Sequence, residues 1–175
     1  MAIDGDEIDR VTAEEQPGPA ELQSALANDT LGEVIQQEPL TVNSGTSLAV
    51  AISRMQDEHR GYVAVLDREK LIGIFTERDV LLRVAGTHLT LDEALIDAYM
   101  TRDPLTLPAD ASVAHAINLM VVEGFRHIPI LDDMGRLVAV ASMRNLMEYL
   151  SDFFRRDVLN LPPQPHPTFR TREGA

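Results

Sequence analysis

The sequence has no cysteine. This absence excludes disulfides, thiolate nucleophiles, iron–sulfur ligation and cysteine-based zinc sites, and it agrees with a cytoplasmic location. The five histidines are dispersed and show neither a His-x-x-x-His nor a His-Glu-x-x-His spacing. A histidine-based metal site therefore has no support either, and we expect no metal.

Long apolar runs and basic residues are also scarce. No run approaches the roughly 18–20 apolar residues that span a bilayer, and no basic start precedes an apolar stretch as in a secretory signal. We expect a globular, soluble, cytoplasmic protein without membrane insertion. The formal charge is −13. This charge opposes nucleic-acid binding, because such binding draws most of its affinity from Lys and Arg neutralising phosphates.

Catalytic patterns are missing as well. The sequence shows no nucleophile placed beside a base, no glycine-rich phosphate loop and no arrangement of paired acids. We therefore predict a protein that is not an enzyme, has no catalytic residues and requires no cofactor.

Both ends of the chain are predicted to lie outside the packed body. Among the first 29 residues there are eight acidic residues and one arginine, without sustained apolar periodicity, so residues 1–28 are expected to form a disordered acidic leader. Residues 160–175 are rich in proline, which favours an extended polyproline-like path. This tail is expected either to lie over a surface groove or to be a mobile end.

The strongest feature between these ends is an internal repeat. Residues 38–42 (EPLTV) return 65 positions later as 103–107 (DPLTL), and residues 47–55 (SLAVAISRM) return as 112–120 (SVAHAINLM). The offset then increases by one, so that 71–79 (LIGIFTERD) corresponds to 137–145 (LVAVASMRN). The body therefore consists of two copies of one unit.

Each copy predicts the same elements. A short strand follows Pro39 or Pro104, and apolar residues at i, i+3, i+4 and i+7 then indicate an amphipathic helix, which we expect to end at Gly61 or Gly124. Two apolar strands and a final helix follow, the helix starting at Thr76 in one copy. A unit of about 55–60 residues has little core of its own. The predicted fold class is therefore α+β, with two pseudo-symmetric β-α-β-β-α repeats packed sheet to sheet.

Three short motifs, found in a fixed order within the two-fold repeat, resemble those of a known family. They are residues 72–79 (IGIFTERD), 99–104 (YMTRDP) and 125–130 (FRHIPI). The chain resembles tandem cystathionine β-synthase (CBS) domains, the Bateman module, over roughly residues 31–155. On this resemblance the first CBS repeat covers 31–86 and the second covers 97–155.

The resemblance implies a function. Members of this family form a pseudo-symmetric pair with two clefts, often dimerise into a flat disc, and commonly bind AMP, ADP, ATP or S-adenosylmethionine. It thus implies a non-catalytic regulatory module that senses an adenosine-type ligand, acts on an unidentified regulated protein and forms a homodimer. The alternative is a ligand-free dimerisation or partner-docking scaffold. Exposed helical faces are expected to form the dimer, with Leu48, Ile52, Ile117 and Met120 as candidates.

Thr76 and Asp79 are the sharpest local signal. A carboxylate accepts hydrogen bonds from both ribose hydroxyls, and the first helical turn stabilises its charge. The same pair fits a simple capping box, and the two roles are compatible. In the second copy Ser142 keeps the cap, whereas Asn145 replaces the carboxylate by a neutral amide. We expect these two residues to be mainly structural and their cleft to be weak, altered or empty.

The other candidates rest on their positions in the resemblance. Thr41 and Thr106 follow a proline at the start of a strand, where relatives contact the base or its ribose; simple β propensity explains them equally well. Tyr62 and Val63 are candidates to line an adenine pocket or to belong to the core. Since Lys70 is the only lysine, phosphate contacts fall to Arg126 and His127, with Arg60, Arg78 and Arg144 as further candidates.

Overall fold

The computed structural model describes residues 19–153. Its first half contains a four-stranded sheet in the order β1-β2-β3-β4, in which β1 is parallel to β2 and the other pairs are antiparallel. The elements of this half are β1 (Thr41–Asn43), α3 (Leu48–Asp57), β2 (Tyr62–Asp67), β3 (Lys70–Thr76), α4 (Glu77–Asp79), the π-helix η1 (Val80–Val84), the 3-10 helix η2 (Ile96–Ala98) and β4 (Thr101–Arg102).

The second half repeats this arrangement with three strands. Its sheet has the order β5-β6-β7, again with a parallel first pair and an antiparallel second pair. The two halves even share an irregularity in strand pairing. The register shifts between Val65 and Leu66 in β2 and at the equivalent place, between Ile130 and Leu131, in β6. The elements are β5 (Leu107–Pro108), α5 (Val113–Glu123), β6 (His127–Leu131), β7 (Leu137–Ser142) and α6 (Met143–Phe153).

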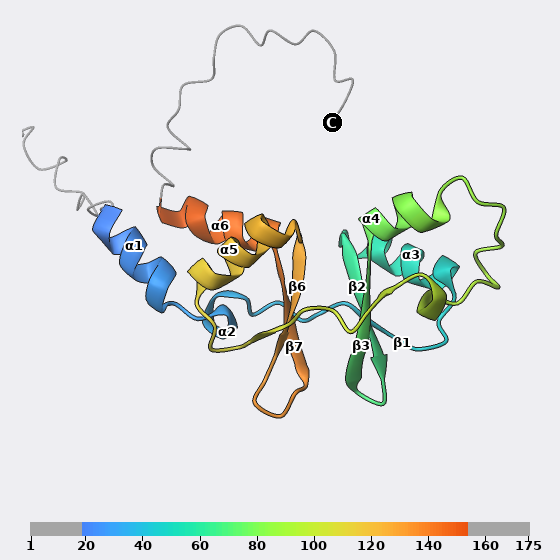
Figure 1. Cartoon of the computed structure of the whole chain (residues 1–175), viewed down its shortest axis with the longest axis horizontal. Helices are drawn as coiled ribbons and strands as arrows, with labels where there is room; N and C mark the ends of the chain where they lie inside the picture. The colour runs from blue at the N-terminus through green and yellow to red at the C-terminus, as the bar shows by residue number, and fades with distance from the viewer. Residues whose placement is uncertain (1–18, 154–175) are drawn as a thin grey trace, which may run out of the picture.

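The two sheets lie side by side in the middle of the molecule, with α3 and α4 on one side and α5 and α6 on the other (Figure 1). Val140 of β7 is buried within the apolar cluster of the first half, where it joins residues such as Val63 and Phe75. The predicted α+β fold of two repeats packed sheet to sheet is therefore confirmed.

The two halves interleave along the chain. The helix α2 (Leu31–Val34) precedes the first sheet, yet Leu31 is fully buried in the core of the second half, and its N–H donates to Ala111 O at 2.9 Å. Conversely, Ile96 and Met100 follow the first half in sequence and are buried in its core. Each core thus takes apolar residues from beyond its own repeat, which suits units too small to bury enough surface alone.

Equivalent serines start the two long helices. The hydroxyls of Ser47 and Ser112 accept hydrogen bonds from Val50 N and His115 N, and both residues have extended backbones. Such N-caps satisfy one of the free N–H groups of the first helical turn.

The ends of these helices differ. Gly124 has φ 71° and forms the left-handed C-cap of α5, as predicted. The expectation that Gly61 ends the first helix is wrong, because α3 ends at Asp57 and the left-handed residue is His59, with φ 52°. Gly61 instead permits a close approach: a Cβ there would lie 3.2 Å from Glu77 Oε2 and 3.3 Å from His127 Cε1.

The prediction of disorder through residue 28 is wrong for residues 19–28, which form helix α1 (Pro19–Asn28). Proline is well suited to the first position of a helix. Leu26 packs against the core of the second half, and Tyr149 Oη donates to Asp29 Oδ2 at 2.7 Å just beyond the helix end. Helix α1 is therefore held by contacts with the second half, which the sequence of the helix itself does not reveal. Residues 1–18 and the predicted tail at 160–175 lie outside the described residues.

Candidate functional site

Two clefts lie between the halves, each at the N-terminus of the helix that follows a hairpin. Cleft one has a volume of about 190 Å³. It lies at the start of α4 and is lined by Gly61, Ile74, Thr76, Glu77, Arg78, Asp79, Thr101, Pro104, Leu105, Phe125, Arg126 and His127.

Asp79 closes a capping box within cleft one. Its Oδ2 accepts hydrogen bonds from Thr76 N at 2.9 Å and from Thr76 Oγ1 at 2.8 Å. Its Oδ1 lies 3.5 Å from Arg83 Nη1, longer than an ordinary hydrogen bond. Asp79 is 8% exposed and is the one buried charged residue in the described part of the chain. The capping role is therefore present, and one carboxylate oxygen is left with a weak partner.

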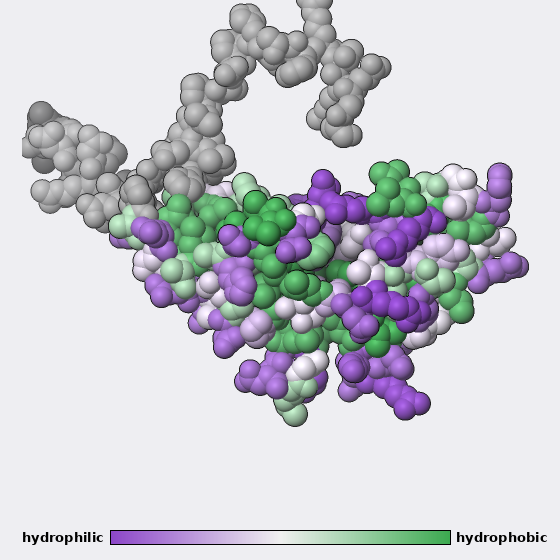
Figure 2. Space-filling model, viewed as in Figure 1, coloured by the Kyte–Doolittle hydropathy of each residue, from purple (hydrophilic) through white to green (hydrophobic). Residues whose placement is uncertain are grey.

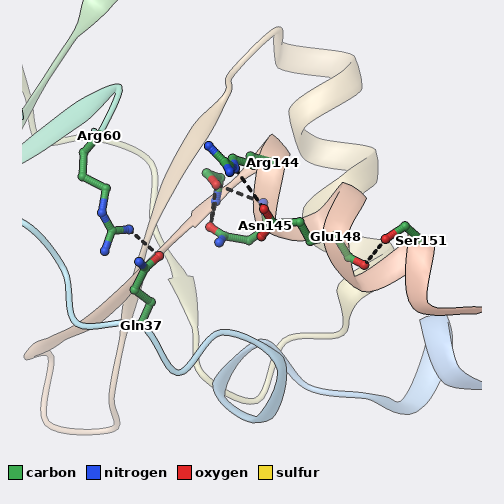
Figure 3. A network of polar contacts seen from close by, with 7 residues as sticks. Gln37, Arg60, Arg144, Asn145, Glu148 and Ser151 are labelled. Atoms are coloured by element: carbon green, nitrogen blue, oxygen red, sulfur yellow. Dashed lines mark hydrogen bonds and ion pairs between the residues drawn. The ribbon is translucent and has the colours of Figure 1, made fainter. Parts of the chain in front are cut away.

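Cleft two is larger, with a volume of about 520 Å³, and lies at the start of α6. Figure 3 shows Arg60 and Gln37 on one side of this region and Arg144, Asn145 and Glu148 on the other. The cleft is lined by Gln37, Glu58, His59, Arg60, Gly61, Tyr62, Glu77, Arg126, His127, Ser142, Met143, Arg144, Asn145 and Glu148.

Asn145 copies the capping geometry of Asp79. Its Oδ1 accepts from Ser142 N at 3.3 Å and from Ser142 Oγ at 2.5 Å (Figure 3). Because the backbone N–H must face an acceptor, the amide nitrogen Nδ2 points away from the cap. The second cleft thus keeps the local fold of the first and changes the group presented to a ligand.

Arg126 and His127 line both clefts; His127 is the first residue of β6 and Arg126 directly precedes it. Burial, helped by the positive charge of Arg126, lowers the pKa of His127 to about 4. His127 is therefore neutral at pH 7 and donates or accepts a hydrogen bond without adding charge. Of this pair, Arg126 is therefore the residue that offers a positive charge to an anion.

The clefts cross-pair the two repeats. Cleft one combines the Thr76 and Asp79 motif of the first repeat with Phe125 to His127 of the second. Cleft two combines Ser142 and Asn145 with Arg60 to Tyr62. Tyr62 therefore lies in cleft two. Burial raises the pKa of its phenol above the ordinary value, although Arg60 opposes this shift.

Of the remaining candidates, some line one of the two clefts and others line neither. Arg78 lines cleft one, while Arg60 and Arg144 line cleft two. Thr41, Val63 and Thr106 line neither: Val63 is fully buried in the core, and the Thr41 carbonyl accepts from Arg54 Nη1 at 2.6 Å. Lys70 starts β3, at the end of that strand opposite Thr76.

Sequence reasoning missed several cleft residues, among them Glu77, Gly61, Phe125 and Gln37. Glu77 lines both clefts, Gly61 allows its side chain to approach, and Phe125 and Gln37 complete cleft one and cleft two respectively. The repeat could have predicted Phe125, because this residue is equivalent to Arg60 of the first copy, which was already a candidate. Within residues 19–153 no group of three His, Asp or Glu side chains is placed to hold a metal, and no described helix is both long and apolar enough to cross a membrane.

The comparisons with known proteins identify the family. The model of the CBS domain family matches residues 31–86 and again residues 96–152. The chain belongs to the CBS domain family. Its two CBS repeats make up most of the sequence, and the two clefts lie between them. The predicted resemblance to a tandem CBS pair is thereby confirmed.

Relatives and solved structures agree with this assignment. A protein of Methanopyrus kandleri is 33% identical over 121 residues, which are 68% of this chain and 61% of that protein. The CBS domain pair of protein MJ0100, solved in complex with 5-methylthioadenosine and S-adenosyl-L-methionine, shares the fold with a TM-score of 0.63 and 22% identity, covering 70% of this chain and 96% of that one.

Another CBS domain protein, PAE2072 from Pyrobaculum aerophilum, was solved in complex with AMP. It aligns with a TM-score of 0.62 and 20% identity, covering 70% of this chain and 98% of that one. At these identities the two structures establish a shared fold. The chain spans somewhat less than two thirds of the Methanopyrus relative.

Proposed function

We propose that this protein is a non-catalytic regulatory module that binds an adenosine-type ligand in cleft one. The observation that carries the proposal is the position of Asp79. Its buried carboxylate has one oxygen used by the cap and the other held only by a 3.5 Å contact to Arg83. A ribose hydroxyl can donate to Oδ1 without breaking the capping box, and charge-assisted hydrogen bonds of this kind are strong.

The walls of cleft one suit the rest of a nucleoside. Ile74, Pro104, Leu105 and Phe125 supply apolar surface for a base, and Phe125 and Leu105 are 38% and 43% exposed in the absence of a ligand. Arg126 also lines cleft one, where its positive charge would attract the 5′-phosphate of a nucleotide and repel the positively charged sulfur of S-adenosylmethionine. The volume of about 190 Å³ lies below the usual 300–1,000 Å³ of ligand pockets, which favours a compact nucleoside derivative. The complexes of two structural neighbours with AMP and with S-adenosylmethionine and 5-methylthioadenosine support this ligand class.

The direct test is a thermal-shift screen of adenosine, AMP, ADP, ATP, 5-methylthioadenosine and S-adenosylmethionine, with the guanine counterparts as controls. A ligand at about 100 times its dissociation constant stabilises the folded state by about 2.7 kcal/mol, and in a body of this size that raises Tm by several degrees. A flat response to every adenosine compound at millimolar concentration would contradict the proposal.

The scaffold alternative is supported by the capping box, which gives one carboxylate oxygen of Asp79 a structural role without any ligand. Under this alternative Asp79 stabilises α4 and the repeats serve only to dimerise or dock a partner. The ligand screen separates the two functions. A regulated partner protein and a cytoplasmic location are part of our proposal.

We also propose a homodimer, for which two of the four residues first expected, Leu48 and Met120, are unavailable. Leu48 and Met120 are buried within the monomer at 0% and 1% exposure, so they are unavailable to a second copy. Four other apolar residues form what we call the exposed helical face. They are Leu81 and Leu82 on η1 and Val121 and Val122 on α5, each between 69% and 73% exposed.

These helices lie along one edge of the molecule (Figure 1), and Figure 2 shows apolar surface over α4 and its continuation and over the α5 and α6 region. A second copy of the chain is the occupant we propose, because a contact between identical faces buries both at once.

A further inference from the structure

Arg83 connects Asp79 to the backbone that leads into a wall of cleft one. Its Nη1 donates to Tyr99 O at 2.7 Å and to Met100 O at 3.0 Å, and the same atom lies 3.5 Å from Asp79 Oδ1. Nη1 carries two hydrogens, and the two carbonyls account for both of them. The contact with Asp79 is therefore an ion pair without a short hydrogen bond, which leaves Oδ1 able to accept from a ligand.

The carbonyls that Arg83 binds belong to residues 99–105, which we call the wall segment. Three residues of this segment line cleft one, namely Thr101, Pro104 and Leu105. The segment also contains β4, which pairs with β3. Arg83 itself does not line the cleft. One side chain outside the cleft thus holds both the wall segment and the carboxylate inside it.

The local structure around Arg83 is unusual. Arg83 lies on the π-helix η1, where Ala85 N donates to Val80 O, five positions earlier, at 2.8 Å. Single π turns are rare and occur frequently at functional sites. The nearby Asp79 is only 8% exposed, and a buried charge is costly unless it is paired. Arg83 supplies that pairing while it stays bound to the wall segment.

The second repeat offers an internal comparison. Tyr149 occupies the position of Arg83, four residues after Asn145. Its Oη donates to Asp29 Oδ2 at 2.7 Å, just before α2. Both side chains therefore hold a segment that lies outside their own helix. The first repeat combines an acid with an arginine, whereas the second combines two neutral side chains. The arginine thus accompanies the carboxylate.

We propose that Arg83 is a positioning residue for cleft one, which holds Asp79 and the wall segment in one arrangement and so couples ligand binding to the order of that segment. This inference rests on the proposed function, since it needs a ligand at Asp79. It deepens that function by naming a route from the cleft to the chain between the repeats. The coupling is reciprocal: a hold that strengthens ligand binding is itself strengthened by the ligand.

The first test is calorimetric titration of the full chain with adenosine. We expect Arg83→Gln to weaken adenosine binding by about tenfold, because Asp79 loses its ionic partner and the wall segment loses two hydrogen bonds. Arg83→Lys keeps the charge but not the planar group with several donors. Its affinity should therefore lie between those of the parent and of Arg83→Gln.

Two matched controls remove similar contacts elsewhere. Arg54 also donates to a backbone carbonyl, Thr41 O at 2.6 Å, and pairs with Glu58 at 3.0 Å, but it lines neither cleft. Tyr149→Phe removes the equivalent contact of the second half. Arg54→Gln and Tyr149→Phe should both bind adenosine as tightly as the parent. A loss in these controls as large as that in Arg83→Gln would overturn the specific role of Arg83.

Hydrogen exchange separates positioning from a merely structural role. The amides of Tyr99 and Met100 both donate to Ile96 O at 2.9 Å and report on the start of the wall segment. Mass spectrometry of peptides from residues 99–105 should show slower exchange when adenosine is bound to the parent. At the same fractional saturation, the slowing in Arg83→Gln should be much smaller. A general loss of stability does not change this comparison, because each protein is compared with and without adenosine.

Equal adenosine affinity in the parent and Arg83→Gln, or equal slowing in both, overturns the role of Arg83 and leaves the proposed function intact. If Arg83→Gln does not fold, Arg83→Lys decides, and an affinity equal to that of the parent overturns the proposal. Absence of adenosine binding to the parent removes the ligand at Asp79 and with it both proposals.

Discussion

Tyr62 and His127 occupy the same position in the two repeats, and their rings are in contact. The ring centroids are 5.1 Å apart and the planes are inclined by 47°. Each residue begins the first strand of its hairpin, β2 or β6. The contact joins the two repeats through equivalent positions, and His127 lines both clefts while Tyr62 lines cleft two. Aromatic contacts of this geometry contribute about 0.5–1.5 kcal/mol beyond the area they bury.

The burial of His127 predicts that the stability of the fold depends on pH. Burial lowers the pKa of His127 to about 4 in the folded chain, whereas an unfolded histidine titrates at about 6.5. Between these values the unfolded state binds more protons, so the stability from neutral His127 is fully present above about pH 6.5 and is lost as the pH falls toward 4. We expect urea denaturation of His127→Gln to show a weaker fall in unfolding free energy between pH 7 and pH 5 than the parent. An equal fall in both proteins would exclude His127 as the cause.

Asp79→Ala is expected to affect ligand binding and stability by different amounts. Loss of a charge-assisted hydrogen bond to ribose should weaken the adenosine-type ligand by about ten- to a hundredfold, while loss of the cap should lower the unfolding free energy by about 1 kcal/mol. Calorimetry and urea denaturation measure the two effects separately. Asn145→Ala is the matched control, since it removes the equivalent cap in cleft two and should change adenosine affinity little. If Asp79→Ala binds adenosine as tightly as the parent, Asp79 acts only as a helix cap and does not bind the ligand.

Gly73→Ala should destabilise the fold by overpacking. A Cβ at Gly73 would lie 2.3 Å from Met100 Sδ and 3.0 Å from Thr101 O, where β4 pairs with β3. Overpacking of this kind costs about 1–3 kcal/mol. Gly61→Ala is the comparison, because its nearest neighbour is the flexible carboxylate end of Glu77. Chemical denaturation should therefore show a larger loss for Gly73→Ala, and the opposite order would contradict the close packing of β4.

The proposed dimer is tested by light scattering. We expect a particle of twice the 19.3 kDa chain mass at micromolar concentration, and we expect the double substitution of Val121 and Val122 by Glu to shift it to the monomer. Met134→Glu is the control, because Met134 is 78% exposed in the turn between β6 and β7, away from the exposed helical face. If the parent protein is a monomer under these conditions, the proposed dimer is wrong.

Much of the fold could be predicted because its signals are local. The apolar spacing from Leu48 to Met55 and its copy from Val113 to Met120 indicated α3 and α5, and Ser47 and Ser112 begin these helices through hydrogen bonds to residues three positions later. Helix α1 was missed because its stability comes from contact with the second half, which lies far along the chain. Gly61 was misassigned for a related reason, since its function is to admit Glu77 from another element.

The candidate site was predicted in part. The motifs at Thr76 and Ser142 do form capping boxes, because both hydrogen bonds of each box close within four residues. Thr41 and Val63 lie outside the clefts because the neighbouring strand and the core cover them. Strand propensity alone does not show which face of a sheet will meet the other repeat.

The sequence by itself determined the repeat, its elements and the helix caps, since each depends on periodicity or on contacts within a few residues. Only the tertiary structure decided that the cap of each repeat shares a cleft with residues just before a strand of the other repeat, as Asp79 does with Arg126 and Asn145 with Arg60. It also decided that Leu31 belongs to the second core and Met100 to the first. The physical reason is that neither repeat can bury its apolar surface alone, so the two combine, and the clefts exist only where the combined surfaces leave a space.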